Sequence, residues 1–186
     1  MALKPDLTLS IVKNYHHVPG YVEKIYYSEN IYRASKSVHS YKEILQTGLE
    51  CMGDIDLYHI CEVTLLAAKS LAAISSDYVL EISHMGLIKA LLHPLEDEIK
   101  EKIVKCIGEK NLHEIHEICH AHTIDHHIER SLEVLVSTYG NYRKVISELK
   151  KLNLTNGAKE ALDELDTICS VLAANKLARN INIDFS

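Results

Sequence analysis

The sequence predicts an α+β protein in which strands dominate the start, helices fill the second half, and a strand closes the chain. Two segments rich in Tyr and Ile, residues 24–33 and 41–51, have the composition of strands. A helical period of apolar residues begins at Asp56, and it continues almost throughout from residue 85 to residue 179. We therefore expect an α/β region at 1–86, a helical region at 87–179 and a further strand that begins at 180–186.

The first 55 residues predict a short helix followed by a β-hairpin. Residues 9–15 (LSIVKNY) are expected to be helical, with Thr8 as the N-cap. The Pro19-Gly20 pair then breaks the pattern. Residues 34–40 (ASKSVHS) are small and polar, as is typical of a loop between paired strands.

The next segment predicts one long helix and a short strand. Asp56 is a plausible cap, and the helix should run to about Ser75. Its apolar stripe consists of Leu57, Ile60, Cys61, Thr64, Ala68 and Leu71. Residues 78–83 (YVLEIS) form another strand candidate.

Helices are expected throughout the second half of the chain. Pro94 should open the first of them, over residues 94–107, because proline suits the first helical turn. Asn111 is placed to cap the next. Further helices are expected near residues 124–136, 142–152 and 158–177. The alternating NINIDFS segment at the end reads as a strand, whose backbone must pair with another segment.

The composition is that of a globular protein and excludes several functions. The 186 residues carry a net charge of −6, with a pI near 6.0, which argues against nonspecific nucleic-acid binding. The five cysteines form no C-x-x-C pair, as expected in a reducing compartment. The N-terminus lacks the apolar core of a secretory signal, and no apolar run is expected to be long enough to cross a bilayer. We expect a cytoplasmic protein without a membrane partner and without a cofactor.

A histidine-rich segment at residues 111–127 holds six of the 12 histidines and the pattern H-E-x-x-H, from His116 to His120. Two histidines four apart on a helix can bind one zinc ion while the glutamate activates a water molecule. Solvated histidines on a polar helix face are the simpler interpretation, with adventitious metal binding as the next. No metal is therefore assigned, and His116 and His120 are kept as the candidates of a zinc-hydrolase alternative.

The second strand of the hairpin carries the more informative side chains. Side chains alternate along a strand, so Gln46, Gly48 and Glu50 should point to one face. The missing side chain at Gly48 would let a ligand approach between an amide and a carboxylate, a pair that suits an ammonium group. Asp6 and Thr8 would add a second carboxylate and a hydroxyl. The alternative is a polar strand that faces solvent.

The hairpin resembles the second signature motif of class II aminoacyl-tRNA synthetases, in the form seen in histidyl-tRNA synthetases. The pattern Y-R-x(12)-Q-x-G-x-E-x-x-G begins at Tyr32, and KPDLT at 4–8 is similar to the family's R-P-E/D-x-T segment. Residues 3–14, the segment 82–86 (ISHMG) and the final NINIDFS resemble a noncatalytic branch of the family, the regulatory subunits of ATP phosphoribosyltransferase. The resemblance covers almost the whole chain and is weakest over 95–175.

The resemblance implies a fold and a binding site. The family fold is an antiparallel sheet flanked by helices, with a helical insertion before the last strands. The resemblance thus implies that residues 1–86 are part of the synthetase-like α/β core, that 87–179 are the insertion, and that 180–186 start a returning core strand. The family's first and third motifs have no counterpart here, so the chain looks like a fragment. By position, Asp6, Thr8, Gln46 and Glu50 would bind histidine. Arg33 would contact an anionic group.

The departures from the synthetases imply regulation rather than catalysis. Their loop between the two strands holds ATP with arginines, whereas this chain offers only Lys36 and Lys42, which lack the bidentate fork. The expected function is a noncatalytic subunit that binds the short catalytic subunit of ATP phosphoribosyltransferase, self-associates and senses histidine. The alternatives are a histidyl-tRNA synthetase-like ligase and a stand-alone histidine-binding module.

Overall fold

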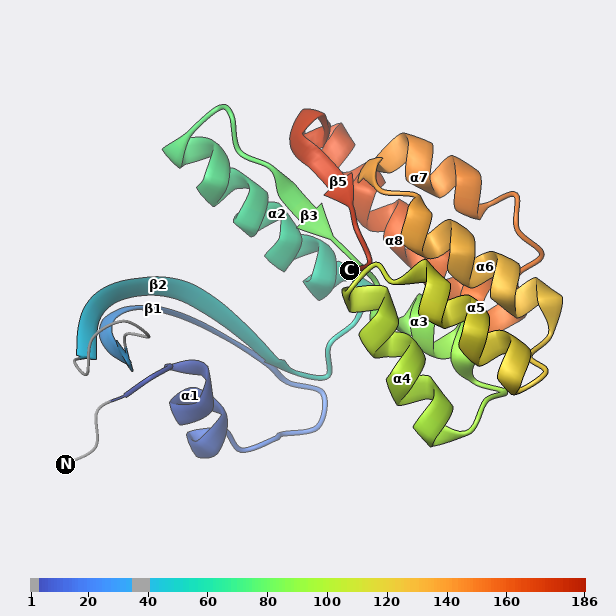
Figure 1. The fold of residues 1–186 in the computed structure, drawn as a ribbon. Coiled ribbons are helices and arrows are strands. Elements are labelled where there is room, and N and C mark those ends of the chain that lie inside the picture. The colour runs from blue at the N-terminus through green and yellow to red at the C-terminus, as the bar shows by residue number, and fades with distance from the viewer. Residues whose placement is uncertain (1–3, 35–40) are drawn as a thin grey trace. The chain divides into compact units, whose positions relative to one another are not determined.

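The computed structural model describes residues 4–34 and 41–186 (Figure 1). The chain forms two compact units, residues 1–63 and residues 64–186, which are described one at a time below. Most of the expected loop between the first two strands, from residue 35 to residue 40 and including Lys36, lies outside the described residues.

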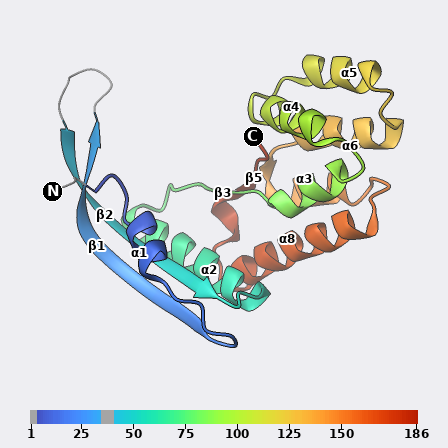
Figure 2. The ribbon, with the colours of Figure 1, turned by 90° about the horizontal axis from the view of Figure 1, so that it is seen from below.

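The first unit is built on a long antiparallel hairpin, which confirms both predicted strands. β1 (Val22–Ala34) pairs with β2 (Tyr41–Gly53) along its whole length, from Val22 opposite Gly53 to Ala34 opposite Tyr41. Figures 1 and 2 show the two strands as one curved ribbon. A register that is continuous over 13 pairs fixes which side chains share a face.

The helix before the hairpin, α1 (Thr8–Asn14), begins one residue earlier than expected, and the predicted Thr8 cap is wrong. Leu7 occupies the N-cap position and makes no side-chain cap bond. The Thr8 hydroxyl instead donates to Glu50 on β2, 2.6 Å away. The residues before α1 run beside the hairpin, since the Tyr32 amide donates to the Lys4 carbonyl at 2.8 Å.

α2 (Leu57–Ile74) follows the hairpin, and Asp56 caps it as predicted, accepting a hydrogen bond from the His59 amide at 3.1 Å. The predicted apolar stripe is only partly buried: Cys61 and Ala68 are, but Ile60 remains 39% exposed. Within the described part of the chain, α2 is the one helix long and apolar enough to span a membrane, so the expectation that no apolar run reaches this length is wrong. Length and composition alone are weak evidence for a span, because core helices also meet these criteria.

The second unit contains a small mixed sheet in the order β3-β5-β4. β5 (Ile181–Ile183) lies in the middle, parallel to β3 (Leu80–Ile82) and antiparallel to β4 (Gly140–Asn141). The strands expected at 78–83 and in the last seven residues are confirmed, although both are shorter. The two-residue β4 was not predicted.

Six α-helices and one short 3-10 helix accompany this sheet in the described residues of the second unit. They are α3 (Met85–Leu92), α4 (Asp97–Gly108), α5 (Leu112–Ala121), α6 (His126–Ser137), α7 (Tyr142–Leu149), α8 (Asn156–Ala174) and η1 (Ala178–Asn180). The Asn111 cap of α5 is confirmed, because its side chain accepts from the Glu114 amide at 3.2 Å. The prediction that Pro94 opens a helix is wrong: the chain turns there, and α4 starts at Asp97.

The core of the second unit comes from the apolar stripes of these helices. Figure 2 shows α4, α5 and α6 next to one another, with α3 beside α8. Ile103, Ile115, Leu132 and Leu165 are fully buried, each from a different helix. The expected boundaries at residues 86 and 179 stay a prediction, because the two compact units of the structure meet between residues 63 and 64.

Candidate functional site

The predicted site residues of β2 share one face of the hairpin. Gln46, Gly48 and Glu50 lie opposite Glu29, Tyr27 and Ile25 of β1, and alternate residues of paired strands point to the same side. Gln46 and Glu50 are both half-buried. The amide and the carboxylate therefore project from the same surface, as expected from the sequence.

The segment before α1 brings Thr8 and Asp6 to this face. The Thr8 hydroxyl donates to Glu50 Oε1 at 2.6 Å, and the Thr8 amide donates to Asp6 Oδ1 at 2.7 Å. Thr8 therefore contacts both carboxylates, one through its side chain and one through its backbone. Three predicted residues from two distant parts of the chain form one connected hydrogen-bonded group.

Tyr27 fills the space above Gly48, so the expected gap for a ligand is occupied by the protein itself. A Cβ atom added at Gly48 would lie 2.5 Å from the Tyr27 hydroxyl oxygen. Gln46 Nε2 donates to the same hydroxyl at 3.3 Å. Tyr27 was not predicted from the sequence, although an aromatic residue placed across from a strand glycine is a recognisable pairing once the register is known.

One polar atom of the site is buried without a hydrogen-bond partner among the described residues. The side-chain oxygen of Gln46 is buried and accepts no hydrogen bond from the described residues. Buried acceptors are nearly always paired, so an unpaired one indicates where a donor from a ligand or water would be stabilised. This oxygen lies on the face that also carries Glu50.

Arg33 lies on the same face but away from the other four residues. It sits opposite Lys42 near the loop end of the hairpin and is exposed. It lies four positions along β1 from Glu29, the partner of Gln46, which corresponds to about 13 Å of strand. The structure therefore does not bring Arg33 into the group formed by Asp6, Thr8 and Glu50.

A hollow of about 310 Å³ opens on this face next to the hydrogen-bonded group. It lies between α1 and the hairpin, and none of the five predicted site residues lines it. Its lining includes Ile25, which faces Glu50 across the strands, and Met52, two residues further along β2. The remaining lining residues are Leu7, Ser10, Ile11, Asn14, Tyr15 and Glu23.

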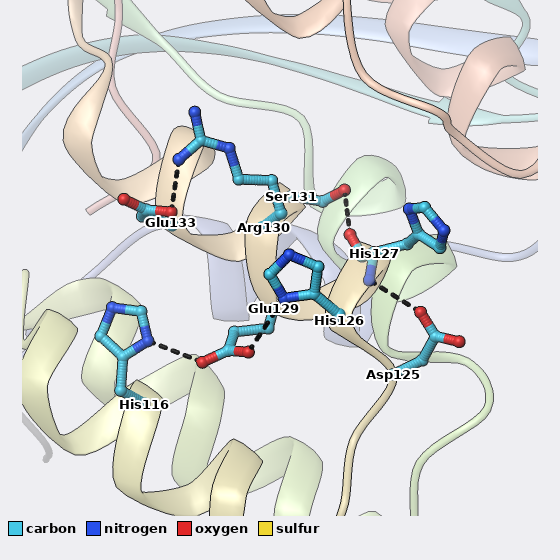
Figure 3. A network of polar contacts seen from close by, with 8 residues as sticks. All are labelled: His116, Asp125, His126, His127, Glu129, Arg130, Ser131 and Glu133. Atoms are coloured by element: carbon cyan, nitrogen blue, oxygen red, sulfur yellow. Dashed lines mark hydrogen bonds and ion pairs between the residues drawn. The ribbon is translucent and has the colours of Figure 1, made fainter.

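The histidine-rich segment of the second unit contributes to a network of His–Glu contacts between α5 and α6. His116 Nδ1 on α5 lies 2.7 Å from Glu129 Oε1 on α6, and His126 Nδ1 lies 3.6 Å from the second oxygen (Figure 3). Over residues 4–34 and 41–186, no group of three or more His, Cys, Asp or Glu residues is placed to hold a metal ion. His116 thus joins two helices, and the structure groups neither His116 nor His120 into a ligand set.

The network predicts acid sensitivity of the α5–α6 contact. The His116 hydrogen bond, helped by His126, holds the pKa of Glu129 below its ordinary value near 4.5. A depressed carboxyl pKa stabilises the fold above the unfolded value, and this stability is lost as the pH falls below about 4.5 and through the folded pKa. We expect Glu129→Gln to lower the free energy of unfolding at pH 6, and its difference from the parent to shrink towards pH 3.

Urea unfolding followed by circular dichroism at both pH values measures this difference. Glu117→Gln on α5 is the matched control, because the Glu117 side chain is 67% exposed and should contribute little at either pH. An equal effect of the two substitutions at pH 6 would contradict a structural role for the network.

An antiparallel hairpin bearing glutamine, glycine and glutamate on one face, flanked by helices, defines the chain as class II synthetase-like. The family model of histidyl-tRNA synthetases matches residues 1–186. The chain belongs to the histidyl-tRNA synthetase family.

Two kinds of relatives are similar to the chain. The ATP phosphoribosyltransferase regulatory subunit of Alkaliphilus metalliredigens is 27% identical over 99% of this chain and 48% of its own length. The histidine–tRNA ligase of Methanococcus maripaludis is 30% identical over 90% of this chain and 42% of its own length. The chain therefore spans about half the length of the curated relatives it matches.

A solved structure is similar in fold. One chain of the ATP phosphoribosyl transferase (HisG:HisZ) complex from Thermotoga maritima matches with a TM-score of 0.75 and 25% identity, covering 98% of this chain and 64% of that one. The predicted fold class is confirmed by this similarity.

Proposed function

We propose that this protein acts as a noncatalytic regulatory subunit of ATP phosphoribosyltransferase in histidine biosynthesis. The observation that carries the proposal is similarity along almost the whole chain to regulatory subunits and to a chain of the complex from Thermotoga maritima. The proposed partner is a short-form catalytic subunit of that enzyme. Self-association remains a prediction.

The residues that would contact ATP phosphates in a synthetase support a regulatory role over aminoacylation. The segment between the strands, residues 34–40, contains no arginine, and Arg33 lies apart from Glu50. Arginine forks bind phosphate oxygens in pairs, and Lys36 and Lys42 lack this fork. A ligase remains the second candidate, because several relatives are named histidine–tRNA ligases.

The hairpin face that carries Gln46 and Glu50 supports histidine as the regulatory ligand. Glu50 offers a carboxylate for an ammonium group, and the buried oxygen of Gln46 offers an unpaired acceptor on the same face. Histidine provides donors for both, in its α-ammonium and in its ring N–H. A ligand that binds one state of the complex better than the other shifts the equilibrium between them.

Two measurements separate the candidate functions. Co-elution with a short-form catalytic subunit in size-exclusion chromatography, together with a change in that subunit's activity, is expected of a regulatory subunit. ATP–pyrophosphate exchange that depends on histidine is expected of a ligase. ATP–pyrophosphate exchange without any effect on the catalytic subunit would favour the ligase over the regulatory subunit.

Glu50→Gln is expected to weaken histidine binding about tenfold without disturbing the fold. The substitution keeps an oxygen that accepts from Thr8 but removes the charge that faces an ammonium group, and charge-assisted hydrogen bonds are roughly twice as strong as neutral ones. Isothermal titration calorimetry with histidine measures the change.

Glu43→Gln serves as the control for this measurement. Glu43 belongs to the same strand but points to the other face, where it accepts from Asn30 and Tyr32. Histidine affinity that is unchanged in Glu50→Gln would remove Glu50 from the site.

A further inference from the structure

A second hollow lies in the helical unit, remote in sequence from the hairpin residues. It measures about 360 Å³, within the range of small-molecule pockets. Three elements form it: the end of α3 with the following turn, the start of α6, and the connection from α7 to α8. Its apolar lining comes from Leu91, Pro94 and Ile128, of which Leu91 is 5% exposed.

Five polar side chains complete this lining, and several keep unused hydrogen-bonding capacity. Asp125 Oδ1 accepts from the His127 amide at 2.7 Å, which leaves the second carboxylate oxygen available. Thr155 Oγ1 accepts from the Ala158 amide at 3.4 Å and keeps its own O–H to donate. Asn153 adds an amide that can both donate and accept.

The base of the hollow is held in place by α6 itself. Ser131 is the one buried polar residue among the described core positions, and its hydroxyl donates to the His127 carbonyl at 2.7 Å. Figure 3 shows Asp125, His127 and Ser131 on the side of α6 away from the contact between His116 and Glu129. The hollow is therefore separate from the histidine network.

The charge of the lining selects the kind of ligand. Asp125 is the single acidic residue in it, and the lining contains no lysine or arginine. A carboxylate with a free oxygen above an apolar floor favours a cation that carries hydrogen-bond donors and a compact apolar body. The N-termini of α6 and α8 reach the hollow, but Asp125 and Thr155 of the lining already cap them. An anion would therefore meet the Asp125 carboxylate without a compensating side-chain cation of fixed charge.

We propose that this hollow binds a small organic cation, of the class of primary amines with a compact apolar body. The ammonium group contacts Asp125, the apolar body covers Ile128 and Leu91, and Asn153 and Thr155 orient polar substituents. The site is additional to the proposed histidine-binding face and does not depend on the proposed function.

The test compares three probes of one size that differ in charge. Benzylamine, benzyl alcohol and benzoate are titrated into the full chain, and amide chemical shifts are followed by NMR. We expect saturable shifts at residues of α6 and of the α7–α8 connection with benzylamine, with a dissociation constant on the order of a millimolar for so small a ligand. Benzyl alcohol should bind more weakly, and benzoate should not bind.

The variant Asp125→Asn tests the charge without removing the helix cap, because asparagine caps helices as well as aspartate does. It should weaken benzylamine binding about tenfold while thermal unfolding stays unchanged. Asp163→Asn, an exposed carboxylate on α8, is the matched control and should leave binding intact.

Three outcomes would each overturn the proposal. They are binding of benzoate at least as tight as that of benzylamine, equal benzylamine affinity in Asp125→Asn and the parent, and shifts that do not saturate or that map elsewhere. Each of these readouts is independent of histidine and of the catalytic subunit.

Discussion

Gly53→Ala is expected to unfold the open end of the hairpin, away from its loop, and to lower the stability of the first unit by about 3 kcal/mol or more. Gly53 has a φ of +125°, a conformation that residues with a side chain rarely adopt. An added Cβ would also lie 2.2 Å from the Tyr21 carbonyl oxygen, a backbone atom that cannot rotate away. Backbone strain and a direct clash therefore act together at one position.

The loss should be large relative to what holds this unit together. Leu7, Ile31 and Cys61 are its buried apolar residues among those described, so its core is thin. Loss of the Val22–Gly53 pairing would also loosen Glu50 and Met52, which follow in the same register. Two-dimensional NMR of the hairpin amides and thermal unfolding measure the effect.

The variant Gly20→Ala separates the effect of backbone strain from the effect of a steric clash. Gly20 also has a positive φ, +75°, but nothing lies within 4 Å of an added Cβ. Its alanine variant should therefore lose only about 1–2 kcal/mol, the cost of the left-handed backbone for a residue with a side chain. Similar losses in both variants would show that the contact with the Tyr21 carbonyl does not matter.

Leu165→Ala should destabilise the second unit by about 2–5 kcal/mol. Leu165 is fully buried on α8, among Leu162, Ile168 and Leu172 of the same helix. The substitution removes apolar contacts and leaves a cavity that the surrounding helices fill only in part. Urea unfolding followed at the helical circular dichroism band gives the change in the free energy of unfolding.

Leu66→Ala makes the same chemical change on a side chain that is 43% exposed. We expect it to cost less than half as much, because less area leaves water when this side chain folds and the vacated space stays open to solvent. Equal losses at the two positions would contradict the placement of Leu165 in the core.

Local sequence patterns predicted the elements that local chemistry controls. The two hairpin strands alternate over many residues, and the caps at Asp56 and Asn111 act within three residues of themselves. Gln46 and Glu50 share a face for the same reason, since strand alternation decides it. Each of these features depends on residues that are close in sequence.

The features that were not predicted from the sequence are interactions between residues far apart in the chain. Thr8 was expected to cap its own helix, but its hydroxyl donates a hydrogen bond to Glu50, 42 positions away. Tyr27 covers Gly48 through a pairing that is visible only once the register is known. Likewise, nothing in the H-E-x-x-H pattern indicates that His116 pairs with Glu129 of the next helix. Tertiary contacts decided these positions against the local preference.

The central position of β5 has a consequence for the order in which the second unit forms. β5 pairs in parallel with β3, about a hundred positions earlier in the chain, and the antiparallel β4 lies on its other side. Closing so long a loop is entropically unfavourable until the intervening helices have shortened the distance between its ends. The three-stranded sheet is therefore expected to form late in the folding of the second unit, and during synthesis the position between β3 and β4 stays vacant until the ribosome has released residues 181–183.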